Sequence, residues 1–131
     1  MKLIYKIWLN NDGDKAFGEG PYKLLKGVQA TGSLREAASG LGMAYSKARR
    51  IIANSERNLG FALTRKKIGG VSGGGSEVTD EGVQIMAAYE RLRSEIENAI
   101  GKVYKKHFGQ SVEVQFYKTV ARKRGEKKCA V

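Results

Sequence analysis

The sequence predicts an α+β fold in which helices dominate. Two helix-like segments joined by a glycine turn lie between residues 32 and 60, and a long amphipathic segment follows at about 79–107. Short β-forming segments precede and separate them. With 131 residues, of which 41% are hydrophobic, the chain can form one small core. We therefore expect one domain over 1–108, then a short strand-like segment and a basic tail over 109–131.

The N-terminal segment MKLIYKIWLN is expected to form a strand over about 2–10. Lys6 interrupts it, it is too short to span a membrane, and no small-residue cleavage site follows, so we expect a cytoplasmic protein. The next segment contains Asp12, Asp14 and Glu19 but lacks the rest of a twelve-residue calcium loop. We expect a solvated loop with a turn there.

A first helix is expected to begin at Gly20 and Pro21, because proline is well tolerated at the first helical position. The 3.6-residue periodicity assigns its core face to Tyr22, Leu24, Leu25 and Val28.

The second helix is expected to begin with a capping box. Ser33 is the N-cap residue, Glu36 follows three positions later, and Gly42 supplies the left-handed residue that ends the helix. Its apolar stripe consists of Leu34, Ala37, Ala38 and Leu41.

The third helix, at about 44–59, has a basic outer face. Its core face is expected to contain Ala48, Ile51, Ile52, Ser55 and Leu59. At about 100° per residue, the opposite face then contains Ser46, Arg50, Ala53 and Arg57, with Lys47, Arg49 and Asn54 on the flanks and Tyr45 near the boundary. A helix-turn-helix places such a helix in the major groove of DNA. The alternative is an ordinary amphipathic helix pair with a solvated basic side.

A wing is predicted after this helix pair. FALTRKKI is rich in β-forming residues, GGVSGGG suits a loop tip, and SEVT returns as a second strand. The chain is therefore predicted to be a winged helix-turn-helix. Arg65, Lys66 and Lys67 lie on or beside the wing, where cations contact phosphates or a minor groove.

Four segments together resemble the DNA-binding domain of the molybdate-responsive ModE-type repressors, distant relatives of the LysR-type regulators. They are FGEGPYKLL, TGSLREAASGLGMAYSKARRII, LG and RKKIGGVSGGGSEVTDEG, and the resemblance covers about residues 1–105. It implies a dimeric transcriptional regulator. Full-length members carry C-terminal oxyanion-binding modules, and too few residues follow the long helix to build one before Val131. We therefore expect no molybdate-binding domain in this chain.

The resemblance assigns DNA contacts to the third helix and to the wing. Arg49 and Arg50 are expected to contact bases, because a guanidinium can pair with both acceptors of guanine. Lys47 and the wing cations are expected mainly to contact phosphates. The full predicted set is Ser33, Tyr45, Ser46, Lys47, Arg49, Arg50, Arg65, Lys66 and Lys67.

The long final helix is predicted to mediate dimerisation. Thr79 caps it, and Asp80 and Glu81 suit the positive end of its dipole. A heptad-like seam follows with spacings of 4, 3, 4, 3 and 4, formed by Ile85, Tyr89, Leu92, Ile96, Ala99 and Val103. Two copies would then bind a palindrome. The alternative is that this stripe docks on the first strand of the same chain.

The charge balance favours a polyanionic partner. Lys and Arg number 24 against 13 Asp and Glu, a net charge of +11. VEVQFY at 112–117 alternates like a strand whose partner the sequence does not identify. KTVARKRGEKKCAV is expected to be disordered, as a phosphate-binding arm or a solubilising tail. Cys129 has no partner for a disulfide or a cysteine metal cluster.

Enzymatic function is not expected. His107 is better explained as a helix-end cation than as a general base, and no nucleophile–base set, carboxylate pair or metal-ligand cluster is visible. GGVSGGG lacks the Gly-Lys-Ser/Thr ending of a phosphate loop. We predict a homodimeric, sequence-specific regulator that binds double-stranded DNA without cofactor or metal. The alternatives are a nonspecific architectural DNA-binding protein and a winged-helix protein-interaction module.

Overall fold

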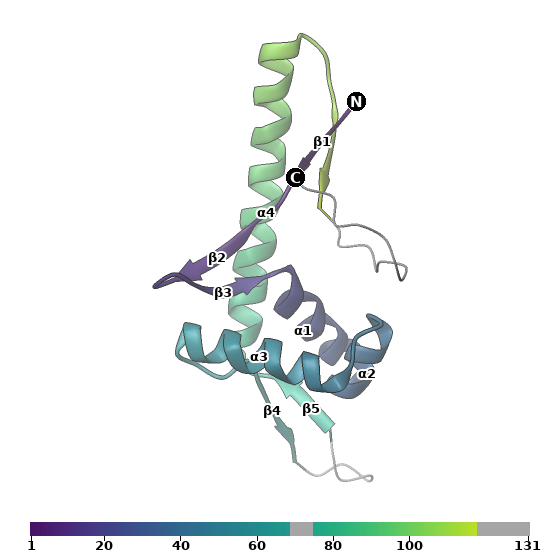
Figure 1. Cartoon of the computed structure of the whole chain (residues 1–131), viewed down its shortest axis with the longest axis vertical. Coiled ribbons are helices and arrows are strands. Elements are labelled where there is room, and N and C mark those ends of the chain that lie inside the picture. Colours follow the sequence, from purple (N-terminus) through teal and green to yellow (C-terminus); the bar gives the residue numbers. More distant parts are fainter. Residues whose placement is uncertain (69–74, 118–131) are drawn as a thin grey trace, which may run out of the picture.

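The computed structural model describes residues 1–68 and 75–117 and shows the predicted α+β fold, mainly helical, with a winged helix-turn-helix (Figure 1). Four helices and three two-stranded sheets form the described part of the chain. In chain order the elements are β1 (Lys2–Tyr5), β2 (Trp8–Asn11), β3 (Asp14–Gly18), α1 (Glu19–Thr31), α2 (Leu34–Gly40), α3 (Tyr45–Leu59), β4 (Thr64–Lys67), β5 (Gly75–Val78), α4 (Asp80–Phe108) and β6 (Glu113–Phe116).

The N-terminal segment forms two strands instead of the single strand expected over 2–10. The chain leaves the first strand at Lys6 and Ile7, and β2 then pairs with β3 in an antiparallel hairpin. The expected acidic turn is confirmed as the tip of this hairpin, with positive φ at Asp12 (50°) and Gly13 (85°), as a two-residue hairpin turn requires. Strand β3 was not predicted, because its five residues are too few to establish alternation.

The strand-like segment at 112–117 has a partner. β6 pairs in parallel with β1, with Lys2 opposite Glu113 and Tyr5 opposite Phe116. The rings of Tyr5 and Phe116 meet edge to face at 5.3 Å. The domain boundary at residue 108 stays a prediction, but the segment that follows it contacts the N-terminal strand.

Helix α1 begins two residues earlier than expected, at Glu19, so Pro21 is its third residue and not its first. Proline is still tolerated there, because the first four N–H groups of a helix have no partner within the helix. The predicted core face is confirmed: Tyr22, Leu24, Leu25 and Val28 are all buried.

The core lies where α1, α2, α3 and the first half of α4 meet, with Phe17 of β3 and Leu63 fully buried among them. Helices α1 and α2 approach closely at one point. A Cβ atom added to Gly27 would lie 2.6 Å from Cβ of Ala37. Glycine at this position therefore permits the spacing of the first two helices.

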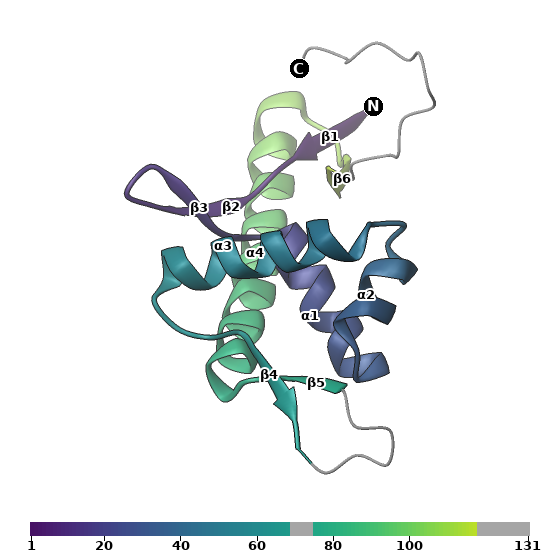
Figure 2. The ribbon, with the colours of Figure 1, turned by 60° about the horizontal axis from the view of Figure 1, so that its bottom comes forward.

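The wing predicted between α3 and α4 is present as the antiparallel pair β4 and β5, with Thr64 opposite Val78 (Figure 2). The N–H of Ser76 donates to the carbonyl oxygen of Gly32 at 2.8 Å, which attaches the wing to the end of α1. Residues 69–74 of the predicted GGVSGGG tip lie outside the described residues.

Helix α4 has 29 residues, about 43 Å at the usual rise, and extends well past α1–α3 (Figure 1). The hydroxyl of Thr79 caps it by accepting from the N–H of Gly82 at 3.0 Å, and it donates to the carbonyl of Ala62 at 2.7 Å. In the described part of the chain, no helix is long and apolar enough to cross a membrane.

Candidate nucleic-acid interface

The first helix of the helix-turn-helix begins as predicted, with one difference. The hydroxyl oxygen of Ser33 accepts a hydrogen bond from the N–H of Glu36 at 3.1 Å. In a full capping box the side chain of Glu36 would accept a hydrogen bond from the N–H of Ser33. Here that N–H donates to Thr31 Oγ1 at 3.2 Å instead. The predicted DNA contact of Ser33 stays a prediction, and its side chain serves as the helix cap.

The turn between α2 and α3 depends on Gly42, which has a φ of +66°. The N–H of Met43 donates to Ala38 O at 2.9 Å, and that of Gly42 donates to Ser39 O at 3.0 Å. These two bonds form a Schellman motif, which satisfies the last carbonyls of the helix.

Leu41 does not belong to the apolar stripe of α2, contrary to prediction. It is 42% exposed, whereas the other three members of the stripe are buried. Leu41 is the C-cap residue, with φ −95° and ψ 4°, so it lies outside the helical periodicity on which the prediction relied.

The inner face of α3 follows the predicted pattern and fixes the direction of its outer face. Ala48, Ile52 and Ser55 are buried, and Ile51 and Leu59 are partly buried against the core. The hydroxyl of Ser55 donates to the carbonyl of Ala16 in β3, so the middle of α3 is attached to the hairpin.

The opposite face of α3 presents cations to solvent, as expected. Ser46, Lys47, Arg49 and Arg50 are all exposed. Among the described residues, none of these three cations has a carboxylate within ion-pair distance. This face can therefore accept an anionic partner without breaking an ion pair.

Two guanidinium groups lie near the ring of Tyr45. The guanidinium of Arg35 lies 4.1 Å from the centre of its ring, and that of Arg49 lies 5.9 Å from it. Tyr45 itself is partly buried against the core. Arg35 was not among the predicted contacts, because nothing in the spacing of α2 indicates that its side chain meets an aromatic ring ten residues later. The stack restrains two exposed cations at the start of α3.

The wing cations differ in their surroundings. Arg65 Nε lies 2.7 Å from Oε1 of Glu77 on the opposite strand, so its charge is partly compensated. Lys66 and Lys67 are exposed and form no ion pair within the described residues. Of the three predicted phosphate contacts, the two lysines are therefore better placed to meet a polyanion.

The predicted dimerisation seam divides into two parts. Tyr89 is not available to a second copy, because it packs in the core of its own domain and is only 1% exposed, and Ile85 is partly buried against the same core. Leu92 and Val103 remain 37% and 57% exposed. The apolar heptad pattern does not distinguish burial within the chain from burial against a second copy, so it was compatible with both environments.

An apolar groove of about 410 Å³ runs beside the outer half of α4. Leu3 of β1 lines one side of it, so the alternative in which the stripe docks on the first strand holds in part. Val103, in the same groove, is still mostly exposed. The lining residues are Leu3, Ile96, Ala99, Ile100, Val103, Tyr104, His107 and Phe108.

The other sites considered in the sequence lie on α4 or in the C-terminal segment. Within residues 1–68 and 75–117, no group of three His, Cys, Asp or Glu side chains could hold a metal ion. His107 is exposed in the last turn of α4, next to Lys105 and Lys106. Cys129 and the basic segment at 118–131 lie outside the described residues.

Comparison with known proteins agrees with the resemblance inferred from the four motifs. "Molybdenum transport protein ModE" of Azotobacter vinelandii is 26% identical over 102 residues, which cover 78% of this chain and 38% of that protein. The protein of the same name from Herbaspirillum seropedicae is 31% identical over 93 residues, 71% of this chain and 31% of that protein. The chain resembles ModE. It spans about a third of the length of these relatives, and no family model matches it.

Among solved structures, ArgP from Mycobacterium tuberculosis is similar with a TM-score of 0.48 and 14% identity, over 76% of this chain and 43% of that chain. The family of these curated relatives is the one that the four motifs indicated.

Proposed function

We propose that the protein is a homodimeric transcriptional regulator that binds double-stranded DNA sequence-specifically and acts in the cytoplasm. The outer face of α3 supports this proposal, because it presents Lys47, Arg49 and Arg50 without carboxylate partners among the described residues. The resemblance to ModE covers about a third of each relative, so the proposal does not include the molybdenum transport that their name states.

In this proposal α3 enters the major groove, which is about 12 Å wide and admits one helix. Arg49 and Arg50 contact guanines, and Ser46 and Tyr45 contact bases or phosphates. Arg35 joins this set as a phosphate contact, because the Tyr45 ring restrains its guanidinium at the start of α3. Lys66 and Lys67 of the wing contact the neighbouring backbone.

Dimerisation is proposed through the exposed part of the α4 stripe, formed by Leu92, Ile96, Ala99 and Val103. Ile96, Ala99 and Val103 line the apolar groove, and Leu92, which is 37% exposed, lies one turn before them on the helix. A two-fold axis across this stripe would present two copies of α3 to the same side of a duplex, with half-sites about 34 Å apart.

Selection of binding sites from a random duplex library at near-physiological salt tests this proposal. Specific binding by a dimer predicts an enriched palindrome whose half-sites lie about one helical turn apart. Tight, salt-sensitive binding without an enriched motif would instead indicate the architectural protein. No binding to any duplex would favour the protein-interaction module.

Alanine variants then separate base contacts from phosphate contacts. Arg50→Ala is expected to cost about 1–3 kcal/mol of binding on the selected site and to relax the preference at one position. Lys67→Ala should weaken binding to all sequences similarly and reduce the salt dependence by about one charge. Lys2→Ala, which removes one positive charge from β1, is the matched control. Equal losses on selected and random DNA for both site variants would contradict the assignment.

A further inference from the structure

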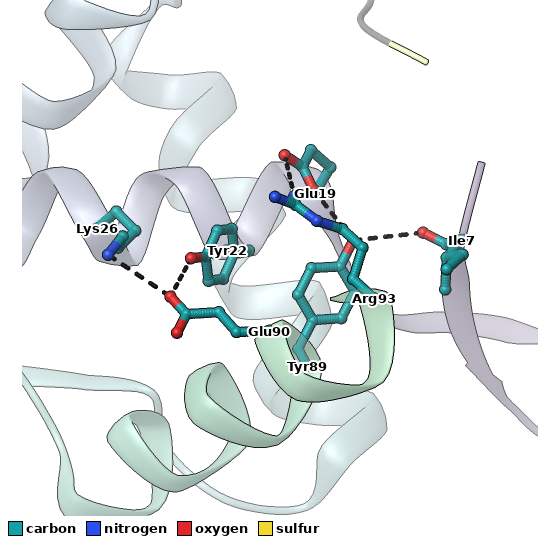
Figure 3. A network of polar contacts seen from close by, with 7 residues as sticks. All are labelled: Ile7, Glu19, Tyr22, Lys26, Tyr89, Glu90 and Arg93. Carbon is teal, nitrogen blue, oxygen red and sulfur yellow. Dashed lines mark hydrogen bonds and ion pairs between the residues drawn. The ribbon is translucent and has the colours of Figure 1, made fainter. Parts of the chain in front are cut away.

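A network of polar contacts joins the start of α1 to the middle of α4 (Figure 3). Arg93 Nη1 donates to both carboxylate oxygens of Glu19, at 2.9 and 2.8 Å. The hydroxyl of Tyr89 donates to Glu19 Oε2 at 3.0 Å, and the backbone carbonyl of Ile7 lies 3.5 Å from the same hydroxyl. One glutamate of α1 therefore binds two successive turns of α4.

A second set of contacts lies one turn further along α1. The hydroxyl of Tyr22 donates to the carboxylate of Glu90, which also lies 3.5 Å from Nζ of Lys26. Figure 3 shows both sets between the facing sides of α1 and α4. Together the two sets of contacts restrain both the position and the orientation of α4 relative to α1.

The Glu19–Arg93 pair is well shielded for a surface ion pair. Its side chains are 20% and 31% exposed, and the Arg93 guanidinium also lies 5.2 Å from the ring of Phe116 and 5.8 Å from that of Tyr22. Burial, and then the Glu19 carboxylate, raise the pKa of Tyr89, which favours the protonated hydroxyl that donates to Glu19. Charge-assisted bonds of this kind restrict geometry more than neutral ones.

We define the joint as the three residues Glu19, Tyr89 and Arg93. Its position in the chain has a larger consequence than the strength of its contacts. Glu19 directly follows β3, and β3 holds α3 through the bond from Ser55 to Ala16. Arg93 directly follows the first exposed residue of the apolar stripe, Leu92. The joint therefore lies between the proposed DNA-binding helix and the proposed dimerisation surface.

A small change in the angle between α1 and α4 at the joint would produce a large displacement at the DNA-binding end of the domain. Helix α1 has 13 residues and is about 20 Å long. Over a lever of about that length, a tilt of about 10° moves the far end by about 3.5 Å, which is close to one base-pair step of 3.4 Å. In a two-fold dimer the displacement would occur in both copies.

We infer that the joint of Glu19, Tyr89 and Arg93 sets the number of base pairs between the two half-sites that the dimer accepts. The three side chains are positioning residues, because none of them belongs to the proposed DNA-contacting set. This inference rests on the proposed function, since it requires a dimer that binds two half-sites.

Binding competition among duplexes that share the selected half-site and differ only in spacer length tests the inference. The wild type is expected to prefer one spacer sharply. Glu19→Gln keeps the shape of the side chain but removes its charge, and Tyr89→Phe removes only the hydroxyl. In both variants we expect the preference for the optimal spacer over its neighbours to fall by about tenfold or the optimum to move, with unchanged affinity for an isolated half-site.

Glu113→Gln is the matched control, because it makes the same charge change in the exposed pair with Lys2, where the two charged atoms lie 4.0 Å apart. Sedimentation of every variant establishes whether it is dimeric. Tyr89→Phe keeps the core filled, so it provides a second folded variant if Glu19→Gln unfolds. A wild-type spacer profile in the folded, dimeric variants would overturn the inference and leave the proposed function intact. A wild type that selects no paired half-sites would overturn both.

Discussion

The close approach of α1 and α2 at Gly27 predicts that the smallest possible substitution there is harmful. In Gly27→Ala the new methyl group would lie 2.6 Å from Cβ and 3.0 Å from Cα of Ala37. Both atoms are fixed to the α2 backbone, so no side-chain rotation relieves the overlap. Gly40→Ala, in the last turn of α2, meets no atom within 4 Å and is the matched control.

The magnitude follows from two opposing contributions. Alanine inside a helix is favoured over glycine by about 0.5–1 kcal/mol. Overpacking that displaces backbone costs about 1–3 kcal/mol. Gly27→Ala should therefore lower the free energy of unfolding by about 1–2 kcal/mol, whereas Gly40→Ala should leave it unchanged or raise it by up to about 1 kcal/mol.

Urea unfolding followed by circular dichroism measures both variants. The difference between them should also appear as a separation in Tm of several degrees, since about 1 kcal/mol corresponds to roughly 2–8 °C for domains of this size range. If Gly27→Ala proved as stable as Gly40→Ala, the helices would not be in contact there, and the reasoning would be refuted.

Three further predictions concern side-chain contacts. Arg35→Ala and Tyr45→Ala should weaken DNA binding less than additively when combined, as a double-mutant cycle would show; strict additivity would mean that the stack does not matter for binding. Burial raises the pKa of Tyr22 to about 12, so stability present below pH 10 should be lost as the pH rises from 10 to 12. Urea unfolding across that range should show a shallower loss in Tyr22→Phe, and parallel curves would contradict it. Glu77→Ala releases Arg65 and should strengthen binding to random DNA and steepen its salt dependence, which titrations at several salt concentrations would measure.

The helix-turn-helix could be predicted from the sequence because its signals are local. The cap at Ser33, the left-handed Gly42 and the apolar spacing of α3 each act within a few residues, and all three are found in the structure. Once the inner face of α3 is known, helical geometry gives the outer face directly. The position of the outward-facing cations of α3 therefore followed from short-range information.

Contacts between distant residues could not be predicted in this way. The parallel pairing of β1 with β6 and the stacking of Arg35 on Tyr45 leave no periodic pattern in the sequence. Tyr89 was assigned to the dimerisation seam because an apolar position looks the same whether its own core or a second copy covers it. The ion pair of Arg65 with Glu77 depends on the register of the two wing strands. The glycine-rich sequence between these strands does not specify that register.

The pairing of β1 with β6 also has a consequence for biosynthesis. Its partners Lys2 and Glu113 are separated by almost the whole described chain. At usual rates of translation, the ribosome needs about 5–20 s to make the intervening 110 residues. The α1–α3 unit is complete well before β6 emerges, so β1 is synthesised before the other described strands and is among the last of them to be paired. During that interval the edge of β1, which carries Leu3 and Ile4, is open to other nascent chains and to a chaperone that binds extended segments.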